Sequence, residues 1–344
     1  MSNYIRKKIL LVIAGDFYVN EKTRLKTNRG LKEIIDQFPE IGIMADVDSL
    51  LIATNKEEEL TPALWVPTHQ AVMDHLDDYD GFVVVVPLEA MLESSLAAAF
   101  VLQTASKPVL FTGSPTKILL APPLDLEINL LGYRELGVRS NLVGAIHTVL
   151  TMPNEVCVFY GNRVMRAVQT ARSHQATMRM YEPWQSDLVG RSGLGLIRTS
   201  DHSWQKYLKS PTSFNAFSSE VASLRMMPSQ WERLAFSVVT ADLKAMIYDI
   251  SPVRQLPQGL MRFIADRPSL VHVLYSLRAV NSIQLNVPQQ ANVFAVTKMT
   301  PEVAQMKLSW LLAQMKDPAD LPRLQDLMQR SLVGEIDPNP TIPR

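Results

Sequence analysis

The residues best placed for acid–base chemistry are Asp16 and Glu89, each of which closely follows an apolar run typical of a buried strand. Asp16 follows the run 9–14, and Glu89 follows the run 81–86, which is β-branched and aromatic without polar alternation. Such strands are typical of parallel sheets, whose carboxyl ends meet at one edge, where ligands bind. Two carboxylates confined there can divide their pKa values into an acid and a base. We therefore treat this pair as a candidate site.

The segment from Asp77 to Pro115 contains the elements that would position Glu89. Its apolar run 81–86 predicts a strand that Pro87 ends, and from Leu88 the apolar residues recur at helical spacing. A second short apolar run, 108–111, predicts the next strand. The unit is then strand, helix, strand with a right-handed crossover.

The same unit carries a family resemblance. Residues 78–84, Asp-Tyr-Asp-Gly-Phe-Val-Val, and 107–113, Lys-Pro-Val-Leu-Phe-Thr-Gly, resemble the L-asparaginase/glutaminase family. So do residues 138–142, 161–172 and 298–312, so the resemblance covers nearly the whole chain. It is similar to the bacterial cytoplasmic type I branch of that family.

The resemblance implies an α/β fold with two domains. We expect a larger N-terminal domain of three layers with a mostly parallel sheet, residues 1–189, and a smaller C-terminal α/β domain, residues 217–344. The mixed, Ser- and Thr-containing segment 190–216 is predicted to link them. A strand and its approach are predicted at 42–52, and further strands at 155–160, 221–226, 244–250 and 270–275. Helices are predicted from 61, over 129–149, 228–241 and 256–266, and from 300.

The resemblance fails at the positions that carry the family's chemistry. Asp16 stands where the family has its nucleophilic threonine, and Leu88 and Glu89 stand where it has a second threonine and an aspartate. Arg172 takes the place of the catalytic lysine, and a guanidinium stays protonated at any physiological pH. The family's mobile lid falls on the segment 18–29, which has no tyrosine after Tyr18 to match the family's catalytic one.

The substrate-binding loops that the resemblance implies are altered as well. The loop 55–62 offers three consecutive glutamates, including Glu58 and Glu59, where the family holds a substrate carboxylate, which these glutamates would repel. We interpret this loop as solvated and acidic rather than as a cation site. In the second domain a glycine turn of the family falls on 252–257, and Gln255 occupies it with both glycines gone. Glu58, Glu59 and Gln255 are kept as candidates for lining the cleft.

Composition restricts the partners. The 34 basic and 34 acidic residues balance, so no global field attracts nucleic acid or an anionic membrane. No apolar stretch approaches the roughly 20 residues of a membrane span. The six histidines are scattered, and neither a metal nor a cofactor is expected. The single cysteine, Cys157, lies in a strand-like run and fits a buried core position in a reducing, cytoplasmic compartment.

Three functions remain open on these residues. The leading hypothesis is a catalytically silent family member that acts through binding or assembly, as a homo-oligomer (a dimer or a tetramer) or in a hetero-oligomer with an active relative. The alternative is an amidohydrolase with altered chemistry at Asp16 and Glu89, and residual asparaginase activity is the third. We also expect Arg172 to form an ion pair with Glu89, with Asp16 close enough to join it.

Overall fold

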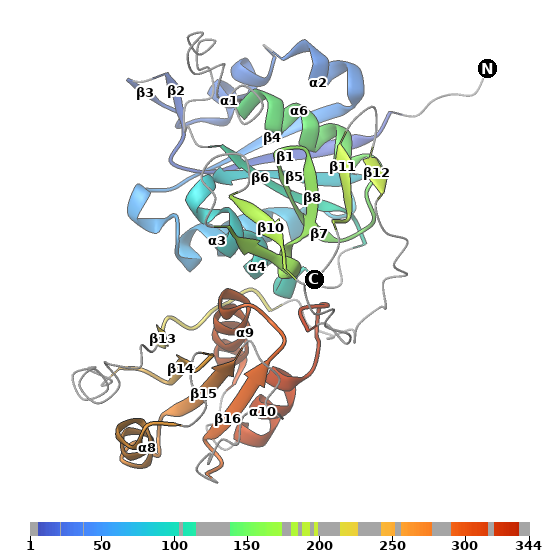
Figure 1. Ribbon diagram of the computed structural model, residues 1–344. Helices are drawn as coiled ribbons and strands as arrows, with labels where there is room; N and C mark the ends of the chain where they lie inside the picture. Colours follow the sequence, from blue (N-terminus) through green and yellow to red (C-terminus); the bar gives the residue numbers. More distant parts are fainter. Residues whose placement is uncertain are drawn as a thin grey trace, which may run out of the picture. The chain divides into compact units, whose positions relative to one another are not determined.

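Figure 1 shows the chain as a computed structural model that divides into two compact units, residues 1–215 and 216–344. The structure describes residues 6–20, 22–36, 38–102, 106–114, 138–173, 180–184, 188–192, 196–198, 214–225, 242–251, 256–276, 290–315 and 320–336. The predicted helix 228–241 and the turn 252–255, which includes Gln255, lie outside these residues.

The first unit is built on an eight-stranded sheet in the order β12-β11-β8-β7-β6-β5-β1-β4. Five neighbouring strands are parallel, and β8, β11 and β12 continue the sheet in antiparallel pairs. The strands are β1 Lys8–Gly15, β4 Asp46–Ala53, β5 Gly81–Pro87, β6 Val109–Ser114, β7 Val156–Tyr160, β8 Arg163–Arg166, β11 Gly190–Ser192 and β12 Leu196–Arg198. The predicted α/β class with a mostly parallel sheet is confirmed.

Helices cover both faces of this sheet, which gives three layers (Figure 1). The helices are α1 Asn28–Ile35, α2 Pro39–Met44, α3 Pro62–Asp74, α4 Met91–Val101 and α6 Val138–Val149. Buried residues of α1, α2 and α6 pack on Ile9, Leu11 and Ile13 of β1, while α3 and α4 lie against the opposite face. Because β1 and β5 are buried on both faces, the apolar runs without alternation are explained.

Short elements follow several strands of the sheet. They are β2 Tyr18–Asn20 and β3 Thr23–Arg24, the 3-10 turns η1 Lys56–Glu58, η2 Leu88–Ala90 and η4 Ala167–Gln169, and the hairpin strands β9 Thr170–Arg172 and β10 Tyr181–Pro183. The helix predicted from Leu88 therefore begins as a 3-10 turn and becomes α-helical at Met91.

One sequence boundary differs in the structure. The residues predicted to start the linker at 190 form β11 and β12, which extend the first sheet, and the two units divide after Asn215. In the segment 42–52, predicted as a strand and its approach, the strand β4 starts at Asp46, and the residues up to Met44 belong to α2.

The second unit has a four-stranded parallel sheet in the order β13-β14-β15-β16. Its elements are β13 Val221–Arg225, β14 Ala245–Asp249, α8 Gln258–Ala265, β15 Val271–Ser276, β16 Val293–Thr297, α9 Pro301–Gln314 and α10 Leu321–Gln329. Helix α8 packs on one face, and α9 and α10 lie on the other (Figure 1). Thr300 caps α9 as predicted, its hydroxyl accepting the Val303 N–H at 3.2 Å.

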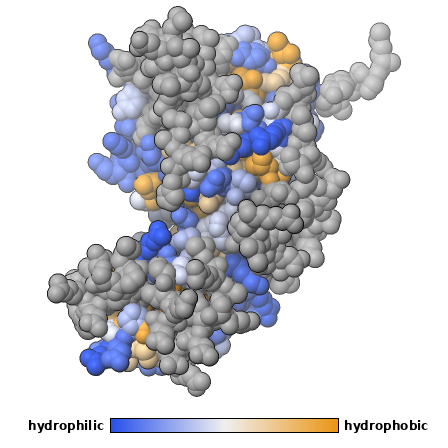
Figure 2. Space-filling model, viewed as in Figure 1, coloured by the Kyte–Doolittle hydropathy of each residue, from blue (hydrophilic) through white to orange (hydrophobic). Residues whose placement is uncertain are grey.

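The part of the surface that is coloured in Figure 2 is of mixed polarity. Figure 2 shows hydrophilic and apolar residues interspersed on the visible face. Ile43 and Leu60 are the strongly exposed large apolar side chains among the residues that the structure describes. No helix within those residues is long and apolar enough to cross a membrane. Cys157 is buried, as expected.

A buried histidine joins the two helices on one face of the first sheet. His69 of α3 is fully buried, and its Nε2 lies 3.3 Å from the carbonyl oxygen of Ser94 in α4. Its Nδ1 lies 3.4 Å from Oδ1 of Asn215. Burial lowers the pKa of His69 to about 4, although both contacts oppose the shift.

This lowered pKa predicts an acid-dependent loss of stability. The unfolded chain takes up a proton at His69 near pH 6.5 and the folded chain only near 4, so stability is present above pH 6.5 and falls between these values. The loss from this group reaches roughly 3 kcal/mol, at about 1.4 kcal/mol per pKa unit. Denaturant unfolding from pH 7 to pH 4 should show a smaller loss for His69→Gln than for the parent. His75→Gln is the control, and an equal change in both variants would contradict the assignment.

Candidate functional site

The carboxyl ends of β1 and β5 meet, as the sequence predicts, because the two strands pair in parallel. Gly15 ends β1 with φ +136, and a Cβ there would lie 2.7 Å from Cδ of Pro87 at the end of β5. Both the backbone conformation and the close approach exclude a larger residue. The turn after β1 is therefore held directly against the turn that carries Leu88 and Glu89.

Asp16 lies in that first turn and is almost fully buried. Its Oδ1 lies 2.5 Å from Nε of Arg24, and the Tyr18 hydroxyl donates to its Oδ2 at 3.3 Å. Arg24 also donates through Nη2 to the carbonyl oxygen of Thr54, which follows β4. The carboxylate is thus neutralised by the hairpin of β2 and β3, and its expected contact with Arg172 is wrong.

The glutamates of the acidic loop have structural partners. Glu59 is buried, and its Oε1 accepts the backbone N–H of Asp16 at 3.0 Å. Glu58 accepts the backbone N–H of Asn55 at 2.9 Å and so caps the 3-10 turn η1. The prediction of a solvated loop is therefore wrong for Glu59, because its carboxylate fixes the turn after β1.

The second turn presents different groups. Leu88 is 3% exposed, so an apolar side chain fills the position at the end of β5. Glu89 directs its carboxylate outward on an exposed residue of η2. Gly113 at the end of β6 packs against this turn, since a Cβ there would lie 2.9 Å from the carbonyl oxygen of Val86. The turn therefore offers one exposed carboxylate and no hydroxyl.

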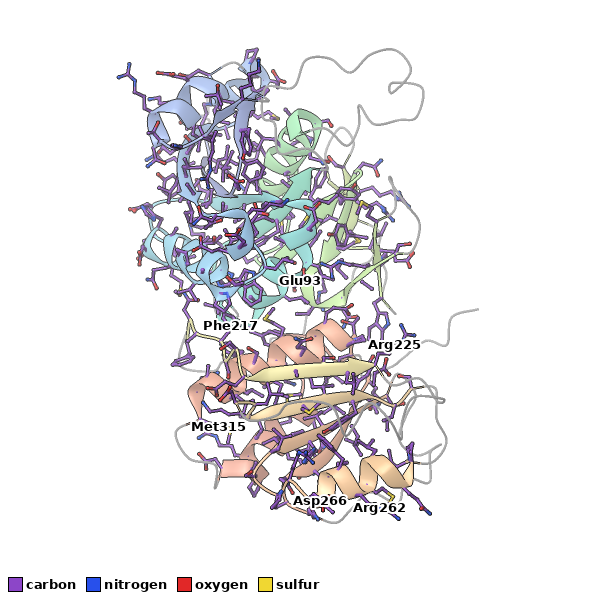
Figure 3. The ribbon with its side chains drawn as sticks, turned by 90° about the vertical axis from the view of Figure 1, so that its left-hand side faces the viewer. Glu93, Phe217, Arg225, Arg262, Asp266 and Met315 are labelled. Atoms are coloured by element: carbon purple, nitrogen blue, oxygen red, sulfur yellow. The ribbon has the colours of Figure 1, made fainter. Side chains whose placement is uncertain are left out.

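Arg172 forms its ion pair with Glu93 and not with Glu89. Its Nη2 lies 2.6 Å from Oε2 of Glu93 in the first turn of α4, and it donates to the backbone carbonyl of Glu89 at 2.9 Å. Figure 3 labels Glu93 on this helix. Glu93 follows Glu89 by four residues and lies in the first turn of α4, whereas Glu89 belongs to the 3-10 turn η2 before the helix. The predicted partner was therefore wrong by one turn.

Tyr181 completes the contacts on this turn. It pairs with Arg172 across the hairpin of β9 and β10, and its hydroxyl donates to the carbonyl oxygen of Leu88 at 2.6 Å. Burial raises the pKa of Tyr181 to about 12, and the nearby Arg172 offsets only part of the shift. Tyr181 therefore stays protonated as a donor, and its neighbour Arg172 stays a cation.

Three of these residues were missed by sequence reasoning: Arg24, Glu93 and Tyr181. The spacing of Glu93 four residues after Glu89 was a usable signal, because such residues share a helix face. Arg24 and Tyr181 gave none, since each arrives through a hairpin whose register the sequence does not specify. Gln255 lies outside the described residues. Within the described ranges, no group of three or more His, Cys, Asp or Glu residues is placed to hold a metal ion.

Chemically, the edge holds two closed charge clusters. One is Asp16 with Arg24, and the other is Arg172 with Glu93. Each guanidinium also bonds a backbone carbonyl, of Thr54 and of Glu89 respectively. Such an arrangement fixes turns, because neither cation can accept a proton and the buried carboxylate is already paired.

Comparisons with known proteins agree on the family. Residues 9–132 match the family model described as Asparaginase, N-terminal. L-asparaginase 1 of Escherichia coli (strain K12) is 23% identical over 296 residues, which is 82% of each chain. A component of the glutamyl-tRNA(Gln) amidotransferase of Saccharolobus solfataricus is 25% identical over 329 residues, covering 90% of this chain and 71% of that protein.

Solved structures show the same fold. The thermostable L-asparaginase from Thermococcus kodakarensis superposes with a TM-score of 0.70 at 16% identity, covering 96% of this chain and all of that one (100%). L-asparaginase I from Vibrio cholerae gives a TM-score of 0.68 at 21% identity, over 96% and 99% of the two chains. The likeness at this identity concerns the fold.

A double-mutant cycle tests the partner of Arg172. Removing Arg172 and Glu93 singly and together, as alanine variants, should give a coupling energy on the order of 1 kcal/mol, because the pair is only partly shielded from solvent. The same cycle with Glu89→Ala should give a coupling near zero, since only the backbone of Glu89 contacts Arg172. Urea unfolding measures both. A coupling to Glu89 as large as that to Glu93 would contradict the structure.

Proposed function

Since the chain belongs to the asparaginase/glutaminase family, we propose that it is a member that has lost amide hydrolysis and acts through binding or assembly. The observation that carries the proposal is Leu88, a buried apolar side chain where the family resemblance places a catalytic hydroxyl. Hydrolysis of this kind needs an activated hydroxyl that attacks the amide carbon. No other residue of that turn supplies one.

The proton acceptor that such a reaction needs is missing too. The resemblance places the catalytic lysine on Arg172, whose guanidinium binds Glu93 and the carbonyl of Glu89. An arginine in this arrangement cannot give up and regain a proton as a lysine can. The nucleophile position holds Asp16, which is already paired with Arg24. An active enzyme would therefore need other residues to supply both the nucleophile and the proton acceptor.

The alternative is an amidohydrolase with altered chemistry at Asp16 and Glu89. The exposed carboxylate of Glu89 favours it, because that group is free to meet a ligand at the edge of the sheet. The ion pair between Asp16 and Arg24 argues against it. An acid–base pair of carboxylates needs one of them to be protonated, and a permanent cation beside Asp16 favours its ionised form. We therefore rank this function second.

Ammonia release tests the proposal. Purified protein incubated with L-asparagine or L-glutamine should release no more ammonia than a buffer blank, because the activated hydroxyl and the base are absent. Asp16→Asn and Glu89→Gln are the matched controls. Turnover that disappeared in either control would establish the altered enzyme instead, and turnover that survived both would indicate residual activity at other residues.

Assembly is the second part of the proposal. Several of the relatives are named as subunits of an amidotransferase, which makes association with another chain a reasonable role for this one. We propose a homo-oligomer, a dimer or a tetramer, or a hetero-oligomer with an active relative, in a reducing compartment such as the cytoplasm. The mixed polarity of the face coloured in Figure 2 is compatible with this, because many interfaces are no more apolar than the remaining surface.

The homo-oligomer is tested by light scattering. The chain has a mass of 38.6 kDa, so a dimer or tetramer should return two or four times that value at micromolar concentration. Dilution should then shift the mass toward the monomer. A constant 38.6 kDa over the whole concentration range would exclude self-assembly and leave the hetero-oligomer.

A further inference from the structure

The hairpin of β2 and β3 is anchored at both ends beside Asp16. Its first strand starts two residues after Asp16, and the backbone N–H of Leu25, just past β3, donates to the carbonyl of Phe17 at 2.8 Å. Phe17 and Leu25 are both buried in the core beneath α1. The base of the hairpin is therefore fixed, and this fixes the position of Arg24, the last residue of β3.

The side chain of Arg24 contacts the residues that follow β1 and β4. Its Nε meets Oδ1 of Asp16 after β1, and its Nη2 donates to the carbonyl of Thr54 after β4. One planar guanidinium thus joins the ends of two neighbouring strands, which suits a group with several donors in a fixed fork. The Arg24 side chain is 31% exposed and that of Asp16 10%, so the cation lies on the outside of the pair.

A carboxylate as buried as that of Asp16 requires a compensating partner. Tyr18 and Arg24 supply a hydrogen bond and a positive charge, and the carboxylate of Glu59 is bound to the Asp16 N–H. Without Arg24 the charge of Asp16 would be stranded. An external cation could satisfy it only by taking the place of Arg24.

We propose that the hairpin is an internal plug, in which Arg24 is the resident cation of a site that would otherwise bind an external guanidinium or ammonium group beside Asp16. Release of Arg24 would open the carboxyl ends of β1 and β4 together. The inference goes beyond the proposed loss of hydrolysis, because the plug would close the site whether or not the protein releases ammonia. Its test uses no activity.

Chemical rescue of Arg24→Ala is the experiment. Hydrogen exchange at the Leu25 amide should become faster on the order of tenfold or more, since a charge-assisted pair that holds the hairpin is lost. Guanidinium chloride at about 20 mM, far below the molar concentrations that unfold proteins, should restore most of the protection. Sodium chloride at the same concentration should not, because sodium lacks the donor fork.

Two further variants make the result specific. Arg29→Ala removes an exposed arginine that pairs with Glu33 within α1, and its exchange at Leu25 should match the parent with or without guanidinium. The double variant Arg24→Ala, Asp16→Asn should show fast exchange that guanidinium cannot correct, since the acceptor is gone.

Three outcomes would overturn the plug: unchanged exchange in Arg24→Ala, rescue of Arg24→Ala by sodium chloride as well, or rescue of the double variant. If Arg24→Ala does not fold, Asp16→Asn alone carries the test in the full chain. It should speed exchange at Leu25 because Arg24 loses its charged partner, and exchange equal to the parent would reject the proposal. Neither outcome of the exchange experiment depends on whether the protein releases ammonia, so the two proposals are tested separately.

Discussion

A carboxylate buried at the end of a parallel strand needs a partner, and the edge of the first sheet is arranged around that need. The backbone of Asp16 is fixed, because Gly15 before it lies close to Pro87 and its own N–H is held by Glu59, and its side chain is buried. The compensating charge must therefore come from a segment that can reach inward. The hairpin of β2 and β3 supplies it through Arg24. An acidic residue at this position and an arginine on the hairpin depend on one another.

The arginine at position 172 has a similar consequence. The Nη2 atom of Arg172 binds both the Glu93 carboxylate and the Glu89 carbonyl, and the guanidinium keeps its charge at physiological pH. The carboxylate of Glu93 lies in the first turn of α4, where the helix dipole already favours a negative charge. Arg172 therefore stabilises the start of this helix and is lost as a titrating group. Tyr181, protonated because it is buried, fixes the preceding carbonyl.

The sequence predicted the strands of the first sheet better than it predicted the side-chain contacts at their ends. Runs such as 81–86 identified buried parallel strands because both faces of those strands are covered, and the meeting of Asp16 and Glu89 at one edge followed from parallel pairing. The partner of Arg172 could not be obtained this way. By charge alone Glu89 was a suitable partner for Arg172. In the structure Glu89 is exposed and the guanidinium reaches Glu93, and these positions depend on three-dimensional geometry.

The same limit explains the boundary at 190. Strands β11 and β12 are three residues each and lie among glycine and polar residues, so no periodicity distinguishes them from a linker. They are strands because β8 offers an edge to pair with, which is a tertiary effect. Glu59 is a comparable case. An acidic run is usually solvated, yet here one member is buried because the N–H of Asp16 requires an acceptor.

The two charge clusters bear on the proposal that this chain does not hydrolyse amides. The turn after β1 is closed by Arg24 from one hairpin, and the turn after β5 is closed by Arg172 and Tyr181 from another. Because the two hairpins are separate elements, a hydroxyl placed at Leu88 would still face an arginine that cannot accept its proton. A lysine at Arg172 would in turn act on a turn without a nucleophile. If the proposal holds, neither substitution alone should produce amide hydrolysis, because each supplies only one of the two groups that the reaction needs.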